Sequence, residues 1–460
     1  VLDTSVANVS LSHIAGSLSA TLDESTWVLT SYLVANAVVL PMSGWFSSLL
    51  GRKRFYLMCV FIFTTSSLLC ALAPSLGWLI FFRILQGLGG GGLQPTSQSI
   101  LMESFPPEKR GQAMAMFGIG VIFAPIIGPV LGGWLTDNFS WHWIFLINLP
   151  VGILSIVLTS AILQDPPYLK RLSLKDGARI DFMGFGLVVL GLASLEIVLD
   201  EGQRNDWFSS PFIVTFAILA VVGLVAMVLW ELRQEHPVVD LRLLKDRTFA
   251  SSTVLLFMLG FVLYGSTFLI PTFLQTMVGF DATTSGLVMT PGGFVILVSM
   301  PIVGALVRKV DTRLMVAYGL IMTGIGLHIM STWDLGTGYW DAALARVVQS
   351  MGLGCLFIPI SVMAYSTLSK VMANQAAGLM NLFRNIGGSV GIAILNTILS
   401  RRTQFHQVQL VSHLSAGSPI PQAYAAKVGQ ALVAKGYSAA DAAQKGWGLI
   451  WSQTLRQSRY

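Results

Sequence analysis

Long apolar runs separated by short polar segments dominate the chain. Each run is about 20 residues long and lacks the alternation of a half-buried strand, so it predicts a helix that crosses a bilayer. The runs are bounded by Gly, Pro and charged residues. We therefore predict thirteen membrane helices, near residues 1–18, 26–49, 55–73, 77–102, 112–136, 141–163, 182–200, 211–231, 249–275, 282–307, 313–333, 340–368 and 373–400.

Composition supports the same fold class. Hydrophobic residues make up 54% of the 460 positions and charged residues 11%, and the mean hydropathy is +0.70. In lipid every backbone polar group must be paired internally, and runs of this length favour helices over a closed barrel. The sequence therefore predicts an all-α membrane protein. The three cysteines lie in apolar runs and suggest no disulfide framework.

Basic residues lie in alternate loops between the runs. Such loops face the cytoplasm, so the formal net charge of +6 reflects topology and predicts no nucleic-acid partner. The basic residues that define this pattern are Arg52, Lys53, Arg54, Lys109, Arg110, Lys170, Arg171, Lys175, Arg179, Arg233, Arg242, Lys245, Arg247, Arg308, Lys309, Arg313 and Lys370.

Both ends of the chain are unusual for such a protein. The sequence starts at Val1, already inside the first predicted span, and it has no signal-peptide pattern. After Ser400 the chain is polar. Thirteen spans is an odd number, so we expect a truncated first helix and a missing last helix.

An internal repeat relates the two halves. The pattern R-x-x-Q-x-x-G-x-G occurs from Arg83 and again from Arg346, an offset of 346 − 83 = 263 residues. GWFSSLLGRKR from Gly44 and GALVRKVDTR from Gly304 repeat at a similar offset. Duplicated bundles are a transporter design with the substrate site between the halves. We predict a six-helix bundle (1–163), an inserted helix pair with linkers (164–248), five helices of a second bundle (249–400) and a non-cytoplasmic polar tail (401–460).

Asp3 is an acidic residue in an apolar segment. An unpaired carboxylate there is costly, so Asp3 needs a partner or a proton and is a candidate for proton coupling. The alternative is that Asp3 lies at the membrane interface.

Polar residues beside Asp3 form a stripe on one face of the first predicted helix. We assign Thr4 and Asn8 of this stripe, with Asn36 of the second span, to the substrate pathway. Hydrogen bonds between packed helices are the alternative interpretation.

Four further charged residues fall inside predicted spans. Arg83 must be paired or face a cavity, and we favour proton coupling over purely structural bonding. Glu196, Arg346 and Arg384 are secondary candidates, because each also has the option of snorkelling to the headgroups.

Small residues and prolines mark the fifth predicted span. Gly128 and Gly132 are four positions apart with Pro129 between them, and Gly133 follows. This pattern predicts close packing and a bend, which suit a hinge or seal. No cluster with metal-ligand spacing and no Ser–His–Asp set is evident, so the sequence predicts neither an enzyme nor a metal or cofactor site.

Several motifs together resemble the major facilitator superfamily, in particular its fourteen-helix drug:proton antiporters of the EmrB/QacA type. GWFSSLLGRKR is similar to the signature turn, here called the gating turn, with Gly44, Gly51 and Arg52 matching and Ser48 in place of the usual Asp. Other matching segments are LDTSVANVS with Asp3, LIFFRILQG with Arg83, GPVLGG from Gly128, HWIFLINLPVG and NLFRNIGGSVG.

The resemblance implies export of small lipophilic compounds in exchange for protons across a bacterial cytoplasmic (inner) membrane. It implies membrane lipid as the solvent, no cofactor, and a periplasmic adaptor protein with an outer-membrane channel as partners. Two alternatives stay open: an exporter dedicated to one metabolite, such as a siderophore or fatty acid, and a non-transporting membrane sensor.

Overall fold

Helices form all the regular structure in the described part of the chain. The computed structural model describes residues 2–165, 181–235, 237–412 and 419–434, with isolated residues between 438 and 451, and these contain no strand. The helices are α1 (Leu2–Val9), α2 (Leu11–Ser17), α3 (Leu22–Ser25), α4 (Trp27–Leu50), α5 (Arg52–Ala71), α6 (Leu76–Ser104), α7 (Arg110–Asn138), α8 (Trp143–Leu146), α9 (Asn148–Ile162), α10 (Phe182–Glu201), α11 (Pro211–Glu231), α12 (Arg247–Phe273), α13 (Ala282–Leu306), α14 (Thr312–Ser331), α15 (Tyr339–Ala364), α16 (Ala373–Ser412) and α17 (Pro419–Val433).

The predicted all-α membrane fold is confirmed. Eleven described helices are long and apolar enough to cross a membrane, and α7 makes twelve if its two arms, which meet at 48°, count as one span. Basic loops face the cytoplasm, so we call the side with Arg52, Lys109 and Lys309 the basic end of the molecule. The predicted basic residues Lys170, Arg171, Lys175 and Arg179 lie outside the described residues.

The predicted first span differs from the structure. Most of this segment forms two short helices, α1 and α2, because the Ser10 amide bonds to the Ala7 carbonyl three residues back (3.2 Å) and interrupts the α-helical pattern. The Ser10 hydroxyl lies 2.6 Å from the Thr136 hydroxyl of α7. Serine favours such breaks because its side chain competes for local hydrogen bonds.

Aspartates fix where several helices begin. A side-chain oxygen at the N-cap accepts one of the first-turn backbone N–H groups that the helix cannot satisfy itself. This arrangement occurs at α10, α12, α13 and α14, which are capped by Asp181, Asp246, Asp281 and Asp311.

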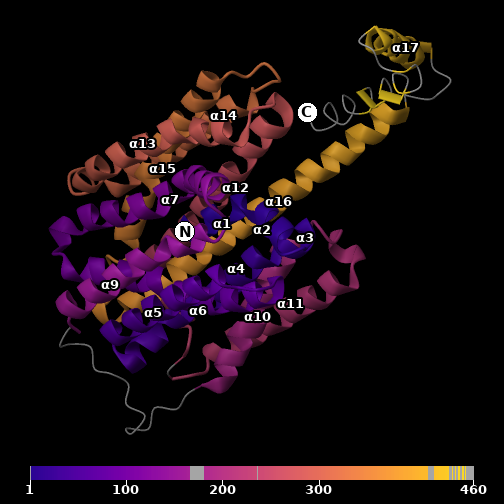
Figure 1. The fold of residues 1–460 in the computed structure, drawn as a ribbon. Helices are drawn as coiled ribbons and strands as arrows, with labels where there is room; N and C mark the ends of the chain where they lie inside the picture. Colours follow the sequence, from indigo (N-terminus) through magenta and orange to yellow (C-terminus); the bar gives the residue numbers. More distant parts are fainter. Residues whose placement is uncertain are drawn as a thin grey trace.

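Corresponding helices pack alike in the two halves of the chain. In the N-terminal half α6 lies against α4 and α5, and in the C-terminal half α15 lies against α13 and α14. Likewise α1 packs on α7, and α12 packs on α16. Figure 1 shows α13, α14 and α15 as one group and α4, α5 and α6 as another, with α7, α12 and α16 between them. This equivalence is the arrangement expected of a duplicated unit.

The two halves meet along a surface that we call the seam, formed by α4 and α6 with α16 and by α7 with α13. Glycines allow very close approach there. A Cβ atom on Gly304 would lie 2.7 Å from the carbonyl oxygen of Gly111, and one on Gly44 would lie 2.8 Å from the Cα of Gln375. These glycines lie near the basic ends of their helices, so the halves are in contact on that side.

Polar side chains also cross the seam. Three hydrogen bonds join α6 to α16, in which Ser99 donates to Asn374 (2.9 Å), Asn381 to Gln98 (2.7 Å) and Arg384 to Gln94 (2.7 Å). Separation of the halves at this position must break these bonds.

The inserted pair, α10 and α11, packs through glycines. A Cβ atom on Gly223 would lie 2.8 Å from the Cα of Gly191. α10 rests on α4 and α16, so the pair lies along the outside of the seam (Figure 1).

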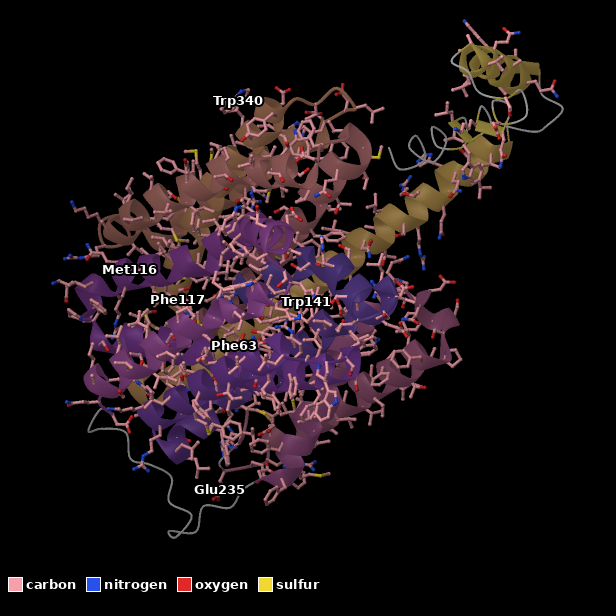
Figure 2. All side chains as sticks on the ribbon, viewed as in Figure 1. Phe63, Met116, Phe117, Trp141, Glu235 and Trp340 are labelled. Carbon is pink, nitrogen blue, oxygen red and sulfur yellow. The ribbon has the colours of Figure 1, made fainter. Side chains whose placement is uncertain are left out.

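The lipid-facing and core-facing sides of one helix can be followed in Figure 2 on α7, where Met116 and Phe117 are neighbours. Met116 is 73% exposed, as expected for a side chain in contact with lipid. The Phe117 ring stacks on Phe357 of α15, with 6.3 Å between the ring centroids.

α16 continues well beyond its predicted end at Ser400. It is a single helix of 40 residues and projects past the bundle towards α17 (Figure 1). The prediction stopped where the sequence becomes polar, but a solvated polar segment can continue a helix that the membrane has already ordered.

We expect Gly111→Ala to destabilise the folded protein. The new methyl group would collide with the Gly304 backbone, and overpacking of this kind typically costs about 1–3 kcal/mol. Thermal unfolding in detergent measures the change. Gly120→Ala on the same helix is the control, because nothing lies within 4 Å of its Cβ position. Equal unfolding temperatures for the two variants would contradict the close contact.

Candidate functional site

A buried ion pair lies inside the N-terminal half. Arg83 of α6 donates from Nη1 to Oδ2 of Asp3 on α1 at 2.6 Å, and the two side chains are 0% and 4% exposed. Arg83 is seven residues from the start of α6 at Leu76, about 10 Å along the helix from the end opposite the basic loops. The structure therefore brings together two residues that the sequence singled out separately.

Neutral side chains also donate hydrogen bonds to Asp3. Its Oδ1 atom accepts hydrogen bonds from Gln86 Nε2 at 3.1 Å and from Asn148 Nδ2 at 2.8 Å. Both amides also donate to the Ser67 hydroxyl, at 3.1 and 3.0 Å. The Asp3 carboxylate thus joins α1 to α6 and α9, and Ser67 of α5 accepts bonds from the two amides that hold it.

The Arg83 guanidinium has further contacts besides Asp3. Its Nε donates to the Val28 carbonyl of α4 at 2.9 Å, and Nη1 donates to Gln86 at 2.8 Å. The guanidinium carbon lies 4.3 Å from the centre of the Tyr32 ring, a cation–π contact. Nη2 has no hydrogen-bond acceptor among the described residues.

Sequence reasoning missed three residues of this network: Ser67, Gln86 and Asn148. Gln86 was visible as the Q of the repeated R-x-x-Q pattern, and Asn148 lies in the HWIFLINLPVG segment. Ser67 carries no signal of its own, because a serine in an apolar run is common.

The glycines of the predicted antiporter motif hold α7 against α1. A Cβ atom on Gly132 would lie 2.8 Å from the Val6 carbonyl oxygen, and one on Gly128 would collide with Ser5. Gly133 is less constrained, since its nearest neighbour would be a Val9 methyl group at 3.9 Å. The motif therefore packs directly on the helix that carries Asp3.

Pro129 accounts for the bend in α7. Lacking an N–H group, it leaves the carbonyl four residues earlier, at Pro125, without its helical partner. The Ser5 hydroxyl of α1 donates to that carbonyl at 3.2 Å. The two arms of α7 meet immediately after Pro125, where this helical bond is missing.

The three predicted pathway residues are not equivalent. Thr4 and Asn36 both interact with the Tyr32 hydroxyl and are partly buried beside Arg83. Asn8 is exposed, so the structure does not bring it to the other two.

The gating turn has a clear geometric basis. Gly51 adopts φ 86°, a conformation that favours glycine, and Gly44 touches Gln375 across the seam. Arg52 pairs with Glu103 at the end of α6, an acid that the sequence analysis did not select. Ser48 donates to the Trp45 carbonyl of its own helix at 2.7 Å.

The three secondary candidates do not snorkel. Glu196, Arg346 and Arg384 are 5%, 0% and 2% exposed. The Glu196 carboxylate accepts a hydrogen bond from Ser389 of α16 at 2.6 Å, which joins the inserted pair to the C-terminal half. Neighbouring helices thus bury these three charged side chains, and none of them extends to the lipid headgroups.

Arg346 repeats the position of Arg83 without the acid. Its Nη1 donates to Ser266 at 3.0 Å and also to Gln349. Ser266 precedes Arg346 by 80 residues, the same separation as Asp3 from Arg83. The duplicated geometry therefore carries a titratable acid in the N-terminal half and a hydroxyl at the matching position in the C-terminal half.

Within the described residues no group of His, Cys, Asp and Glu side chains has the geometry of a metal site. Two matching helical bundles, a seam between them and a buried ion pair in one bundle are the features of a membrane transporter. The chain belongs to the Major Facilitator Superfamily, whose sequence profile matches residues 1–392.

Curated relatives cover nearly the whole chain and confirm the resemblance to EmrB-type multidrug exporters. Identity is 39% to multidrug export protein EmrB of Haemophilus influenzae over 426 residues, which is 92% of this chain and 82% of that protein. It is 36% to EmrB of Escherichia coli over 424 residues, again 92% and 82%. Fatty acid resistance protein FarB of Neisseria gonorrhoeae is 35% identical over 445 residues, or 95% and 85%.

Solved structures share the fold. The human organic anion transporter MFSD10 (TETRAN) aligns with a TM-score of 0.55 at 16% identity, over 86% of this chain and 91% of that one. The proton:xylose symporter XylE aligns with a TM-score of 0.58 at 12% identity, over 88% and 86%. The chain is thus a multi-pass protein of the bacterial cytoplasmic membrane and a transporter.

We expect Asp3→Ala to destabilise the protein strongly, because it leaves the Arg83 guanidinium buried without its anion. Breaking one partner of a buried pair typically costs about 3–5 kcal/mol. The double variant Asp3→Ala/Arg83→Met should lose less than the single variant, since no charge remains uncompensated. Thermal unfolding in detergent compares them. Asp23→Ala is the control, because that side chain is 82% exposed and should have little effect.

Proposed function

We propose that this protein exports lipophilic drugs or toxic compounds across the cytoplasmic membrane in exchange for protons. The EmrB relatives are multidrug export proteins, which supports drug export, and the share of the chain that they cover supports an equivalent activity. The observation that carries the proton coupling is the buried Asp3–Arg83 pair.

Asp3 is suited to the coupling role because its charge state determines how strongly α1 is bonded to the neighbouring helices. As a carboxylate, Asp3 accepts bonds from Arg83, Gln86 and Asn148. A proton on Asp3 removes the ionic attraction and leaves fewer acceptor sites. Protonation therefore weakens the attachment of α1 to α6 and α9.

α7 connects this event to the seam. Gly128 and Gly132 let α7 pack closely against α1. Gly111, at the other end of the same helix, contacts Gly304 of the C-terminal half. A change in the position of α1 is thus passed along α7 to the contact between halves. The exchange cycle follows: proton binding at Asp3 and cargo binding between the halves favour opposite openings of the seam.

In this proposal the working units are the segments 1–163 and 249–400, joined by the inserted segment 164–248, whose helix α10 packs beside the seam. Members of the EmrB group from two-membrane bacteria work with an adaptor, so we include a periplasmic adaptor protein and an outer-membrane channel as partners. A second candidate function is an exporter dedicated to one metabolite, a siderophore or fatty acid. The similarity to fatty acid resistance protein FarB favours a fatty acid.

We expect Asp3→Asn to abolish proton-driven transport. Everted membrane vesicles that contain the protein should accumulate a fluorescent lipophilic compound when energised, and an uncoupler should stop this. With Asp3→Asn the energised rate should fall by at least about tenfold towards the uncoupled rate, because the amide cannot exchange a proton at this site. Arg83→Ala should lose transport while still inserting into the membrane.

Asp23→Asn is the matched control for this experiment, because it removes an exposed carboxylate near the same end of the molecule. Its transport should equal that of the parent protein. Retention of uncoupler-sensitive transport by Asp3→Asn would rule out Asp3 as the coupling site. Transport of many structurally different compounds would indicate a drug exporter, and transport of a single compound would indicate a dedicated exporter.

A further inference from the structure

A buried cation lies in the seam at the depth of the membrane centre. Arg384 of α16 is 2% exposed and donates from Nη2 to the Gln94 side chain of α6 at 2.7 Å. Its guanidinium also interacts with the Tyr264 hydroxyl of α12. Arg384 is eleven residues from the start of α16 at Ala373, or about 17 Å along the helix, roughly halfway through a hydrocarbon core of about 30 Å.

The groups that contact Arg384 are uncharged. Gln94 supplies an amide oxygen and Tyr264 a hydroxyl, while Nε has no acceptor among the described residues. The ion pairs of the described residues do not include Arg384. A guanidinium in an apolar setting is stabilised most by an anion, as Asp3 does for Arg83.

The acid on the neighbouring inserted helix faces elsewhere. Glu196 of α10 accepts a bond from Ser389 of α16, which follows Arg384 by five residues. Five residues correspond to about 140° around a helix, so the two side chains meet different faces of α16. Glu196 is thus engaged on the outer side of the seam.

Arg346, the other buried arginine of the C-terminal half, has a different setting. Its partners Ser266 and Gln349 come from α12 and α15, within one half. Movement of the halves relative to each other leaves those contacts intact. Arg384 differs because one of its partners, Gln94, belongs to the opposite half.

We propose that Arg384 binds the anionic head group of the exported cargo. When the halves separate, the bond to Gln94 breaks and the guanidinium faces the space between them. A carboxylate or sulfonate on an apolar body replaces Gln94 and accepts two parallel N–H donors, an arrangement that guanidinium groups favour. The inference rests on the proposed export function and names its substrate class: lipophilic organic anions.

The location supports this assignment independently of the charge. In transporters built from duplicated halves the substrate site lies near the bilayer midplane, where the halves meet. Arg384 satisfies both conditions, and Arg83 satisfies neither, since Arg83 lies inside one half and about 10 Å from a helix end.

The test compares two permanently charged probes with the same apolar body: phenylhexanesulfonate and phenylhexyltrimethylammonium. Neither crosses a bilayer unaided, so accumulation in energised everted vesicles reports transport. We expect Arg384→Gln to lower the ratio of sulfonate to ammonium transport by at least about tenfold. A loss of this size corresponds to the loss of one charge-assisted hydrogen bond to the sulfonate. Arg384→Lys should lower it less, because it retains the charge but not the planar fork.

Asn381→Ala is the matched control, because it removes a neutral bond across the same seam, to Gln98. It should change transport of both probes by the same factor. Equilibrium binding of labelled sulfonate to the protein in lipid nanodiscs, corrected with empty nanodiscs, adds a readout that needs no transport.

The outcomes separate the two proposals. An equal loss for both probes with Arg384→Gln overturns the anion site and gives Arg384 a structural role. Export of the ammonium probe with no binding or export of the sulfonate also overturns it, while export itself stands. Sulfonate binding that depends on Arg384, with neither probe transported, supports the site and rejects the export function.

Discussion

A charged side chain can remain buried among apolar helices only when its surroundings supply fixed polar partners, and this requirement shapes the interior of the protein. Asp3 of α1 accepts hydrogen bonds from side chains of α6 and α9, and the Arg83 guanidinium takes a backbone carbonyl of α4 and an aromatic ring in addition. The ion pair therefore fixes the position of α1 relative to these three helices.

The duplicated architecture makes the differences between the halves informative. Arg83 and Arg346 occupy matching positions, yet one faces an aspartate and the other a serine at the same sequence separation. One half thus contains an arginine paired with a carboxylate, and the other an arginine bonded to neutral groups. Glycines near the basic end let the backbones touch without side chains between them, so the contact is tight but contains no ionic bond at those positions.

Much of the fold could be predicted from hydropathy, because lipid requires each crossing to be a continuous apolar helix of a certain length. The same rule identified Asp3 and Arg83 separately, since charge in an apolar run is rare. Their pairing could not be derived, because 80 residues separate them and helix packing decides which side chains meet. The break at Ser10 and the extension of α16 past Ser400 were also missed, since local hydrogen bonding, and not hydropathy, controls both. Snorkelling of Glu196 and Arg384 was excluded only by the observed burial.

The length of α16 has a mechanical consequence. At 40 residues it measures about 60 Å, twice the thickness of the hydrocarbon core. It meets the N-terminal half near Gly378, close to its inner end, and its outer third stands clear of the bundle (Figure 1). The inner part of α16 packs on α4, α6, α10 and α12, so its orientation is set inside the bundle. Because the helix is continuous, that orientation also sets the direction in which residues 401–412 leave the bundle.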